Sequence, residues 1–366
     1  MPNIVFHNIT KSYDGINDAV NNLNLDIKEG ELITILGPSG CGKSSSLRML
    51  AGLESITKGE ISIDGTVINN VLAEDRNIAM VFENFALYPH LNVANNLSMP
   101  LIAKKLQKKE IAQKVNEIAK LLEISDQLKK KPNQLSGGQR QRVALARCLI
   151  KQSKIFLMDE PLGHLEAYLR LLLRTEIRRI HETEEATTVY ITHDQEEAAS
   201  LSDRIAVMNQ GKLQQVDTLV NLLDKPHNKF VAQFIGNFPI NLIKGFLLSE
   251  NESYIFSAEN TSSKLIIKEN IKLKNIDLSN LTIGMRPEDF TIEDNITNQN
   301  TLKGEILNIE LIGDKCLINL DSQLGNINIL SNFSKEYKIN DKIFFTPSFK
   351  FLKLFNSEGM NLNLNE

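Results

Sequence analysis

Short, uninterrupted apolar runs recur along the first two thirds of the chain. They cover residues 32–36, 155–158, 188–191 and 205–208, and polar stretches of helical sequence separate the last three. Runs of this length are typical of β-strands, and runs without polar alternation are typical of strands buried on both faces of a parallel sheet. We therefore predict an α/β domain in which helices cross over between parallel strands.

The pattern becomes helical between residues 92 and 150. Good helix formers dominate residues 110–122, and the region contains no convincing strand. We interpret residues 84–150 as a helical subdomain that is inserted into the α/β domain.

The composition changes again in the last third of the chain. Short Ile, Leu and Phe runs at residues 264–267, 317–320 and 342–345 alternate with Asn, Gly and Ser. Several short strands at turn-like spacing are typical of a small all-β domain. We expect an α/β domain over residues 1–236 and a β-rich domain over residues 237–366.

The charge balance and the cysteines narrow the class of protein. The chain has 41 Lys and Arg against 45 Asp and Glu, so it lacks the basic excess of a dedicated nucleic-acid binder, and we expect no nucleic-acid partner. Three distant cysteines, Cys41, Cys148 and Cys316, favour a reducing cytoplasm over a disulfide framework. No apolar run approaches the roughly 18 residues of a membrane span, and no signal peptide follows Met1. Any work at a membrane would be done from its surface.

A glycine-rich segment follows the first apolar run: Gly37-Pro38-Ser39-Gly40-Cys41-Gly42-Lys43-Ser44. Its glycines let successive backbone N–H groups turn inward around phosphates, Lys43 supplies a point charge, and Ser44 supplies a hydroxyl for Mg²⁺. Residues 43–50 predict a helix, so strand, loop and helix follow in the order of a nucleotide-binding phosphate loop. Cys41 is either a thiol with a lowered pKa or a small filler, and we favour the filler.

A second glycine-rich turn lies at another predicted helix start: Leu135-Ser136-Gly137-Gly138-Gln139. The amino end of a helix presents free N–H groups and a positive dipole, which favour a bound anion. A phosphate loop alone indicates one bound nucleotide. The amino end of the second predicted helix indicates a further phosphate-binding position. The two motifs together predict ATP as the ligand and a dimer that ATP closes.

Three more segments extend the pattern, at residues 81–90 (VFENFALYPH), 157–162 (LMDEPL) and 191–198 (ITHDQEEA). With them the chain resembles the ATPase subunits of ABC transporters, and more narrowly those of the maltose and sn-glycerol-3-phosphate importers. The resemblance covers essentially the whole chain. It implies an α/β P-loop ATPase domain with an inserted helical subdomain. The match at Gly284–Glu288 implies that a C-terminal, oligonucleotide-binding-like regulatory domain follows.

The same segments carry candidate site residues. An apolar strand that ends in Asp159 and Glu160 puts one carboxylate where it can hold Mg²⁺ and the next where it can polarise an attacking water. The resemblance implies that Glu160 and His193 are catalytic, that Asp159, Ser44 and Glu83 hold Mg²⁺, and that Tyr13 stacks on adenine. As a single aromatic, Tyr13 is also compatible with a core position.

The resemblance also implies partners. The turn formed by Ser136, Gly137, Gly138 and Gln139 would bind the γ-phosphate held by a second ATPase subunit, in a homodimer or a heterodimer. Membrane permease subunits would grip the region of Tyr88–His90, although its apolar neighbours equally suit ordinary packing. A solute-binding protein would act indirectly, and the chain would be a peripheral protein on the cytoplasmic face of the cell (inner) membrane.

Three positions depart from the family pattern. Glu83 stands where glutamine is usual, and its carboxylate can coordinate Mg²⁺ but adds negative charge beside Asp159 and the phosphates. Gly163-His164-Leu165-Glu166 replaces the usual Ser-Asn-Leu-Asp of a loop that reaches across the dimer. Ser45, which we count with the nucleotide-binding residues, replaces a customary threonine, a mild change.

Two functions therefore stay open. In the first, the chain is a working ATPase that energises uptake of a carbohydrate, polyol or glycerol-3-phosphate-type solute. In the second, it is a nucleotide-binding regulatory subunit of reduced activity that pairs with a catalytic paralogue. Lys43, Glu160, His193 and the intact second turn favour the first. Polyamine and iron importers use similar ATPases, so the sequence leaves the transported solute open.

Overall fold

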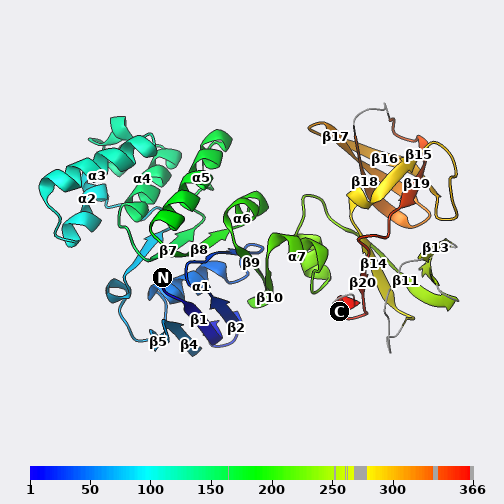
Figure 1. The fold of residues 1–366 in the computed structure, drawn as a ribbon, viewed down its shortest axis with the longest axis horizontal. Helices are drawn as coiled ribbons and strands as arrows, with labels where there is room; N and C mark the ends of the chain where they lie inside the picture. The colour runs from blue at the N-terminus through cyan, green and yellow to red at the C-terminus, as the bar shows by residue number, and fades with distance from the viewer. Residues whose placement is uncertain are drawn as a thin grey trace. The chain divides into compact units, whose positions relative to one another are not determined.

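The computed structural model describes residues 1–163, 165–250, 253–259, 261, 263–267, 278–332 and 337–362. Its chain forms two compact units, which divide between Leu219 and Val220 (Figure 1). The division comes before the boundary expected at residue 236, because the segment after Val220 bonds to residues 359–361 near the C-terminus. The Lys229 N–H donates to the Gly359 carbonyl at 2.8 Å, and the Asn361 N–H donates to the His227 carbonyl at 2.9 Å.

A six-stranded sheet forms the centre of the first unit, in the order β10-β9-β3-β8-β7-β6. Five of its strands are parallel, and β10 pairs antiparallel with β9 at one edge. Every residue of β3, β7 and β8 is buried, so the predicted two-sided parallel sheet is confirmed. The strands are β3 (Leu32–Leu36), β6 (Ile78–Val81), β7 (Ile155–Asp159), β8 (Thr187–Thr192), β9 (Arg204–Asn209) and β10 (Lys212–Asp217).

A second, antiparallel sheet packs with the helix that follows the phosphate loop. Its strand order is β2-β1-β4-β5, and one apolar core joins β1, β2, helix α1 and the central sheet. The strands are β1 (Ile4–Ser12), β2 (Asp18–Ile27), β4 (Lys58–Ile63) and β5 (Thr66–Val67), and the helix is α1 (Lys43–Ala51). A short 3-10 turn at Ala73–Arg76 follows this sheet.

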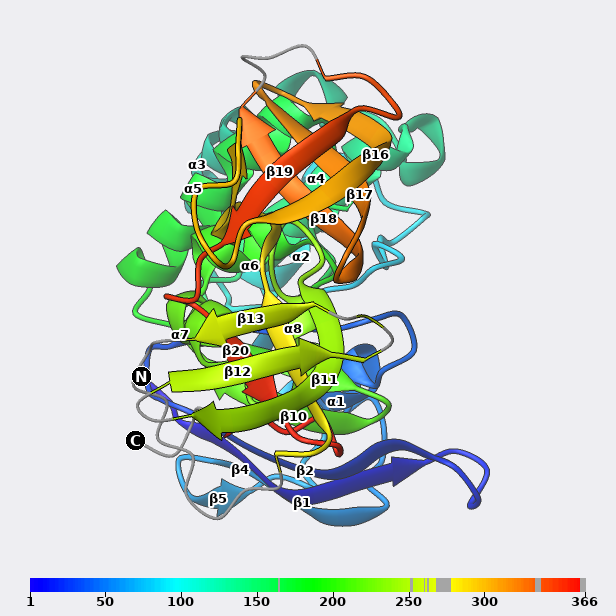
Figure 2. The same cartoon turned by 90° about the vertical axis from the view of Figure 1, so that its right-hand side faces the viewer.

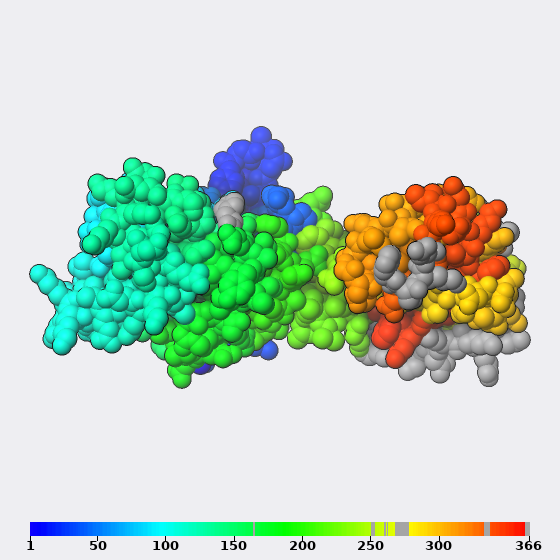
Figure 3. Space-filling view, turned by 90° about the horizontal axis from the view of Figure 1, so that it is seen from above, coloured from blue at the N-terminus to red at the C-terminus, as the bar shows by residue number. Residues whose placement is uncertain are grey.

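Three helices gather in one lobe of the first unit, coloured cyan to blue-green in Figures 1 and 3. They are α2 (Val93–Ala103), α3 (Lys108–Leu121) and α4 (Gly137–Leu149), and they confirm the predicted helical subdomain. Between α3 and α4 lie 3-10 turns at Ser125–Gln127 and Pro132–Gln134. The crossover helices of the sheet are α5 (Ala167–Thr183) and α6 (Gln195–Leu201). Among the described residues, no helix is both long and apolar enough to span a membrane.

The second unit is rich in β-structure, as predicted. It begins with two short helices, α7 (Leu219–Asp224) and α8 (Lys229–Phe234). One five-stranded sheet contains β13 (Lys264–Ile267), β12 (Ser253–Ala258), β11 (Asn241–Glu250), β14 (Leu281–Met285) and β20 (Lys353–Phe355), in that order. The other contains β15 (Phe290–Glu293), β19 (Lys342–Pro347), β16 (Leu302–Ile312), β17 (Lys315–Ser322) and β18 (Gly325–Asn332). Both are antiparallel and share one core, and Figure 2 shows their strands face on.

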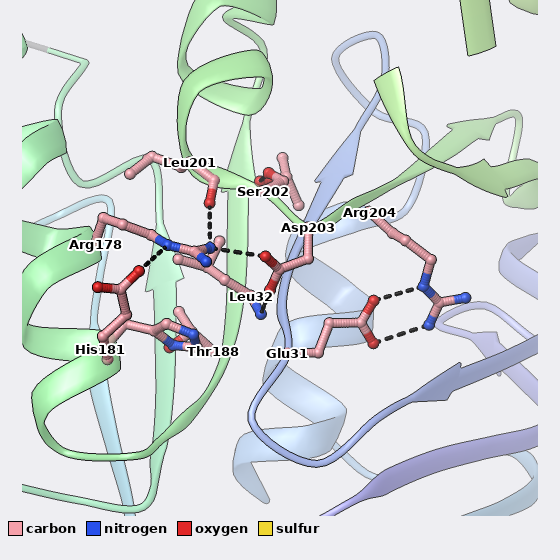
Figure 4. Close-up of polar contacts among 11 residues, drawn as sticks. Glu31, Leu32, Arg178, His181, Thr188, Leu201, Ser202, Asp203 and Arg204 are labelled. Carbon is pink, nitrogen blue, oxygen red and sulfur yellow. Dashed lines mark hydrogen bonds and ion pairs between the residues drawn. The ribbon is translucent and has the colours of Figure 1, made fainter. Parts of the chain in front are cut away.

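A polar network fastens the amino ends of β3 and β9 (Figure 4). Arg178 of α5 donates to Asp203 Oδ1 at 2.9 Å, and Asp203 Oδ2 accepts the Leu32 N–H at 2.8 Å. Glu31 and Arg204 form a two-pronged ion pair beside them. Ligands of α/β sheets bind outside the carboxyl ends of the strands, so this network is structural and leaves the opposite edge for a site.

Candidate nucleotide-binding site

The candidate residues follow four neighbouring strands of the central sheet. Gly37 comes directly after β3, and His193 comes directly after β8. Asp159 ends β7 and Glu160 follows it, and Glu83 is the second residue after β6. Because these four strands are parallel, their carboxyl ends meet at one edge of the sheet. Residues far apart in the sequence therefore gather at a single edge.

The phosphate loop needs its glycines for space and for backbone shape. Gly42 caps α1 with φ of 102°, and Gly40 has φ of 77°, both in the left-handed region. A Cβ on Gly37 would lie 2.3 Å from the Met208 carbonyl oxygen, and one on Gly42 would lie 2.5 Å from the Ala19 carbonyl oxygen. Since glycine carries no side chain, the first N–H groups of α1 have no side-chain cap and suit a phosphate.

Lys43 lies folded into this loop. Its Nζ donates to the carbonyls of Gly37 at 2.8 Å and Pro38 at 2.9 Å, and the side chain is buried. The Sγ of Cys41 lies 3.9 Å from the same Nζ. Burial raises the pKa of the Cys41 thiol and outweighs the opposing charge of Lys43, so the alternative of a lowered pKa is wrong. Cys41 is a buried filler.

Two oxygen ligands suited to Mg²⁺ lie together beside the loop. Ser44 Oγ donates to Asp159 Oδ1 at 3.1 Å, and Asp159 is buried. Burial raises the pKa of the Asp159 carboxyl, Ser44 lowers it, and the charge of Glu83 raises it. The described residues contain no cluster of three or more His, Cys, Asp or Glu that would cage a metal. A hydroxyl and a carboxylate fit Mg²⁺ that takes its other ligands from phosphates and water.

Glu160 and His193 are in direct contact. His193 Nδ1 lies 3.2 Å from Glu160 Oε2, with His193 largely exposed and Glu160 half-buried. The Glu160 backbone has φ of 47°, its N–H donates to the Ile191 carbonyl at 3.0 Å, and its carbonyl accepts from Gln141 Nε2 at 3.2 Å. This arrangement offers water a carboxylate beside an imidazole, which is the geometry of general base catalysis.

Tyr13 lies beside the phosphate loop. Its hydroxyl shares a hydrogen bond of 3.1 Å with Ser45 Oγ, and the Nζ of Lys11 lies 4.8 Å from the ring centroid. The ring is 58% exposed, which excludes the core position that the sequence left open. An exposed ring at this place can stack on a base.

The second glycine-rich turn begins α4 in the helical lobe. Ser136 and Gln139 form a capping box, in which the Gln139 N–H donates to Ser136 Oγ at 3.3 Å and the Ser136 N–H donates to Gln139 Oε1 at 3.0 Å. Ser136 is exposed, and Gly137 and Gly138 are half-buried. The turn therefore offers an accessible helix start that belongs to a different lobe from the phosphate loop.

Two more of the departures from the family pattern, Glu83 and the loop after Glu160, lie next to this site. Glu83 is exposed, and its charge reaches Asp159. In the loop after Glu160, the Leu165 N–H donates to the Leu162 carbonyl at 3.2 Å, and Glu166 caps α5 without a side-chain hydrogen bond. His164 lies outside the described residues.

A groove of about 780 Å³ lies next to the helical lobe, lined in part by Leu53, Glu74, Phe82, Tyr88, Met99 and Lys104. The guanidinium of Arg147 lies 5.3 Å from the Tyr88 ring centroid. Phe85 and Leu87 pack on the core of the lobe, which assigns these two apolar neighbours to packing, whereas Tyr88 is exposed and faces the groove. The sequence pointed to Tyr88 but not to Glu74 or Met99, which come from separate segments.

Comparisons with known proteins find relatives over most of the chain. Residues 20–163 match the family model described as ABC transporter. The chain is 44% identical to the uncharacterized ABC transporter ATP-binding protein YurJ of Bacillus subtilis, over 85% of this chain and 87% of the relative. It is 40% identical, over 98% of each chain, to the oligosaccharides import ATP-binding protein MsmX of Bacillus subtilis. It is 49% identical to the sn-glycerol-3-phosphate import ATP-binding protein UgpC of Rhodopseudomonas palustris, over 66% and 67%.

Solved structures are similar over part of the chain. The dimeric bacterial ABC transporter cassette MJ0796 is 35% identical with a TM-score of 0.56, and the match covers 59% of this chain and 98% of that chain. A post-hydrolysis state of the same cassette, bound to ADP and phosphate, gives a TM-score of 0.55.

Proposed function

This chain belongs to the ATP-binding proteins of the ABC transporter family, and from that premise we propose that it hydrolyses ATP to energise import of a solute. The observation that carries the proposal is the meeting of Lys43, Asp159, Glu160 and His193 at the carboxyl edge of the central sheet. These residues supply a phosphate-binding charge, a metal ligand, a base and an imidazole, which are the parts that phosphoryl transfer to water needs.

Each side chain has a role that follows from its position. Lys43 and the amino end of α1 bind the phosphates. Glu160 accepts the proton of the attacking water, and His193 beside it orients that water or the γ-phosphate. Mg²⁺, held by Ser44 and Asp159 with Glu83 nearby, would neutralise negative charge on the phosphates. Tyr13 supports the base of the nucleotide.

The site is completed by a second ATPase subunit. Ser136, Gly137, Gly138 and Gln139 of one copy bind the γ-phosphate that lies on the phosphate loop of the other, so that two ATP molecules lie between two subunits. The accessible start of α4 supports this arrangement, as does the dimer reported for the similar cassette MJ0796. A homodimer and a heterodimer are both compatible with it.

The groove beside Tyr88 receives membrane permease subunits. Its volume of about 780 Å³ and its mixed lining, with Leu53 and Met99 beside Glu74 and Lys104, suit an amphipathic segment of a partner. The chain then works as a peripheral protein on the cytoplasmic face of the membrane, and a solute-binding protein acts through the permease. The names of the relatives favour a carbohydrate or sn-glycerol-3-phosphate as the solute.

Uptake by cells that lack this chain tests the proposal. We expect loss of uptake of one labelled solute among maltooligosaccharides, pentoses and sn-glycerol-3-phosphate, restored by the wild-type chain and not by Glu160→Gln. Unchanged uptake of all three would contradict the proposed solute class.

A second candidate function rests on Glu83 and on the unusual loop at Gly163–Glu166. In it, the chain binds nucleotide but depends on a catalytic paralogue. Turnover of the purified chain separates the two: hydrolysis by the chain alone supports the first function, and hydrolysis only after addition of the paralogue supports the second.

A further inference from the structure

One arginine joins the segment that follows Glu160 to the turn that follows β8. Arg170 lies in the first turn of α5, where Nε donates to the Leu165 carbonyl at 3.2 Å and Nη1 lies 3.4 Å from Asp194 Oδ2. We propose that Arg170 is a positioning residue that ties the loop at residues 162–166 to the turn at His193 and Asp194, and so holds Glu160 and His193 in working geometry. This proposal rests on the proposed function, because it assigns Glu160 as the base.

The two oxygens of the Asp194 carboxylate make different contacts. Its Oδ1 accepts the N–H groups of Glu196 at 2.7 Å and Glu197 at 3.2 Å, which caps the start of α6. Its Oδ2 faces Arg170. The residue that directly follows His193 is therefore fixed on one side to its own helix and on the other side to α5.

These contacts close a ring around Glu160. On one side, the backbone runs from Glu160 to Leu165, whose carbonyl accepts a hydrogen bond from Arg170 Nε. On the other side, the Glu160 carboxylate contacts His193, and the next residue, Asp194, faces the same guanidinium. A displacement of either loop must therefore move Arg170 or break one of its two contacts.

The surroundings of Arg170 are acidic, which holds its cation in place. Besides Asp194, its charge acts on Glu197, a buried carboxyl that accepts a hydrogen bond of 2.8 Å from the Tyr190 hydroxyl. Without the cation, the repulsion between Asp194 and Glu197 would lose a positive charge that offsets it. Loss of Arg170 should therefore open the His193 turn as well as release the loop.

The two contacts need a guanidinium. Nε and Nη1 lie in one rigid plane and reach two acceptors at once, whereas the lysine ammonium is a single charge on a flexible stem. Lysine can keep the ion pair with Asp194 but loses the fixed fork to Leu165. The Arg170→Lys variant should therefore fall between the wild type and Arg170→Met.

Arg170 lies apart from the phosphate loop. Among the described residues, its side-chain hydrogen bonds go to Leu165 and Asp194 and to none of residues 37–45. Nucleotide affinity should therefore be independent of it.

The experiment compares Arg170→Met and Arg170→Lys with Arg179→Met as the matched control. Arg179 lies on the same helix, is 60% exposed and pairs with Glu176 on that helix. We expect kcat to fall on the order of tenfold to a hundredfold in Arg170→Met, less in Arg170→Lys, with the Kd for ATP unchanged. Arg179→Met should match the wild type in both quantities.

The imidazole resonances of His193 in the full-length protein provide a readout that needs no turnover. We expect them to shift in Arg170→Met and to stay in place in Arg179→Met. Unchanged His193 resonances would overturn the proposal, and so would a loss of ATP affinity equal to the loss of kcat. If the wild-type chain fails to hydrolyse ATP, the proposed function fails, and the His193 resonances still decide whether Arg170 positions the turn.

Discussion

At the scale of single residues, Glu160 combines a reactive carboxylate with an uncommon backbone conformation. Its φ of 47° lies in the left-handed region, where a non-glycine residue costs on the order of 1–3 kcal/mol. Hydrogen bonds from its N–H to Ile191 and from Gln141 to its carbonyl hold this conformation. In this conformation the Glu160 carboxylate contacts the exposed imidazole of His193.

Replacement of this carboxylate by an amide removes the proton acceptor and keeps the shape. We expect Glu160→Gln to lower ATP turnover by about 100-fold or more, because general base catalysis contributes about 10²–10⁴-fold. ATP affinity should be preserved, since phosphate binding lies with Lys43 and the loop. Phosphate release and an ATP titration measure the two quantities, and turnover close to the wild type would remove Glu160 from the role of base.

Glu83 adds a negative charge beside Asp159, in the site that we propose for the phosphates and Mg²⁺. Its charge raises the pKa of Asp159, and a carboxylate that ligates Mg²⁺ must be ionised. Glu83→Gln keeps an oxygen ligand and removes the charge, so we expect the pKa of Asp159 to fall and the half-saturating Mg²⁺ concentration to decrease at acidic pH. The measurement is a Mg²⁺ titration of turnover at several pH values. An unchanged titration in the variant would mean that Glu83 has no influence on the metal site.

At the scale of elements, helix α5 carries residues that contact both ends of the parallel strands in the central sheet. Its first turn carries Arg170 near the site, and its later turns carry Arg178 and His181 at the amino ends of the strands. His181 Nδ1 lies 2.9 Å from Thr188 Oγ1, and the ring is buried. Burial, with a smaller contribution from the charge of Arg178, lowers the pKa of His181 from its usual 6.5.

This buried histidine predicts a pH dependence of stability. Below pH 6.5, His181 binds a proton in the unfolded chain but stays neutral in the folded chain. The contribution of His181 to the free energy of unfolding is therefore complete above pH 6.5, and it is lost as the pH falls toward the lowered pKa of the folded chain. Asp203 and Glu182 oppose this shift without reversing it. His181→Gln can keep a hydrogen bond to Thr188 but does not titrate.

Thermal melting across this range measures the effect. We expect the Tm of the wild type to decrease more steeply below pH 6.5 than the Tm of His181→Gln, and the two slopes to agree above it. Parallel slopes over the whole range would show that the burial of His181 has no part in acid sensitivity.

Sequence patterns predicted some elements well and missed others for physical reasons. The strands of the parallel sheet are short and mostly apolar, and β3 lies at the predicted residues 32–36. The antiparallel sheet was missed because its alternation of buried and exposed positions is irregular. In β1 the register with β2 shifts between Phe6 and Ile9 and again before Lys11, which breaks the period of two.

The same distinction holds for the site. The phosphate loop, Asp159, Glu160 and His193 stand in short motifs at strand ends, so the sequence pointed to them. Arg170 has no motif of its own, because its role depends on contacts with a backbone carbonyl and with a carboxylate 24 residues away. Only the folded chain brings these three groups together.

At the scale of the whole molecule, the two anion-binding ends belong to different parts of the first unit. The phosphate loop joins β3 to α1 of the central sheet, whereas the turn at Ser136 begins α4 in the helical lobe. The composite site that we propose uses the phosphate loop of one copy and the Ser136 turn of another. Damage to one motif in one copy should therefore be repaired by the intact motif of a second copy.

Subunit complementation tests this claim most directly. Lys43→Ala damages the phosphate loop and Ser136→Arg damages the second turn, so each variant alone should be inactive. A mixed dimer contains one intact site, and random pairing predicts that an equal mixture regains roughly a quarter of the wild-type ATP turnover. Melting temperatures close to the wild type would control for folding. A mixture no more active than the two variants measured separately would contradict a site shared between two subunits.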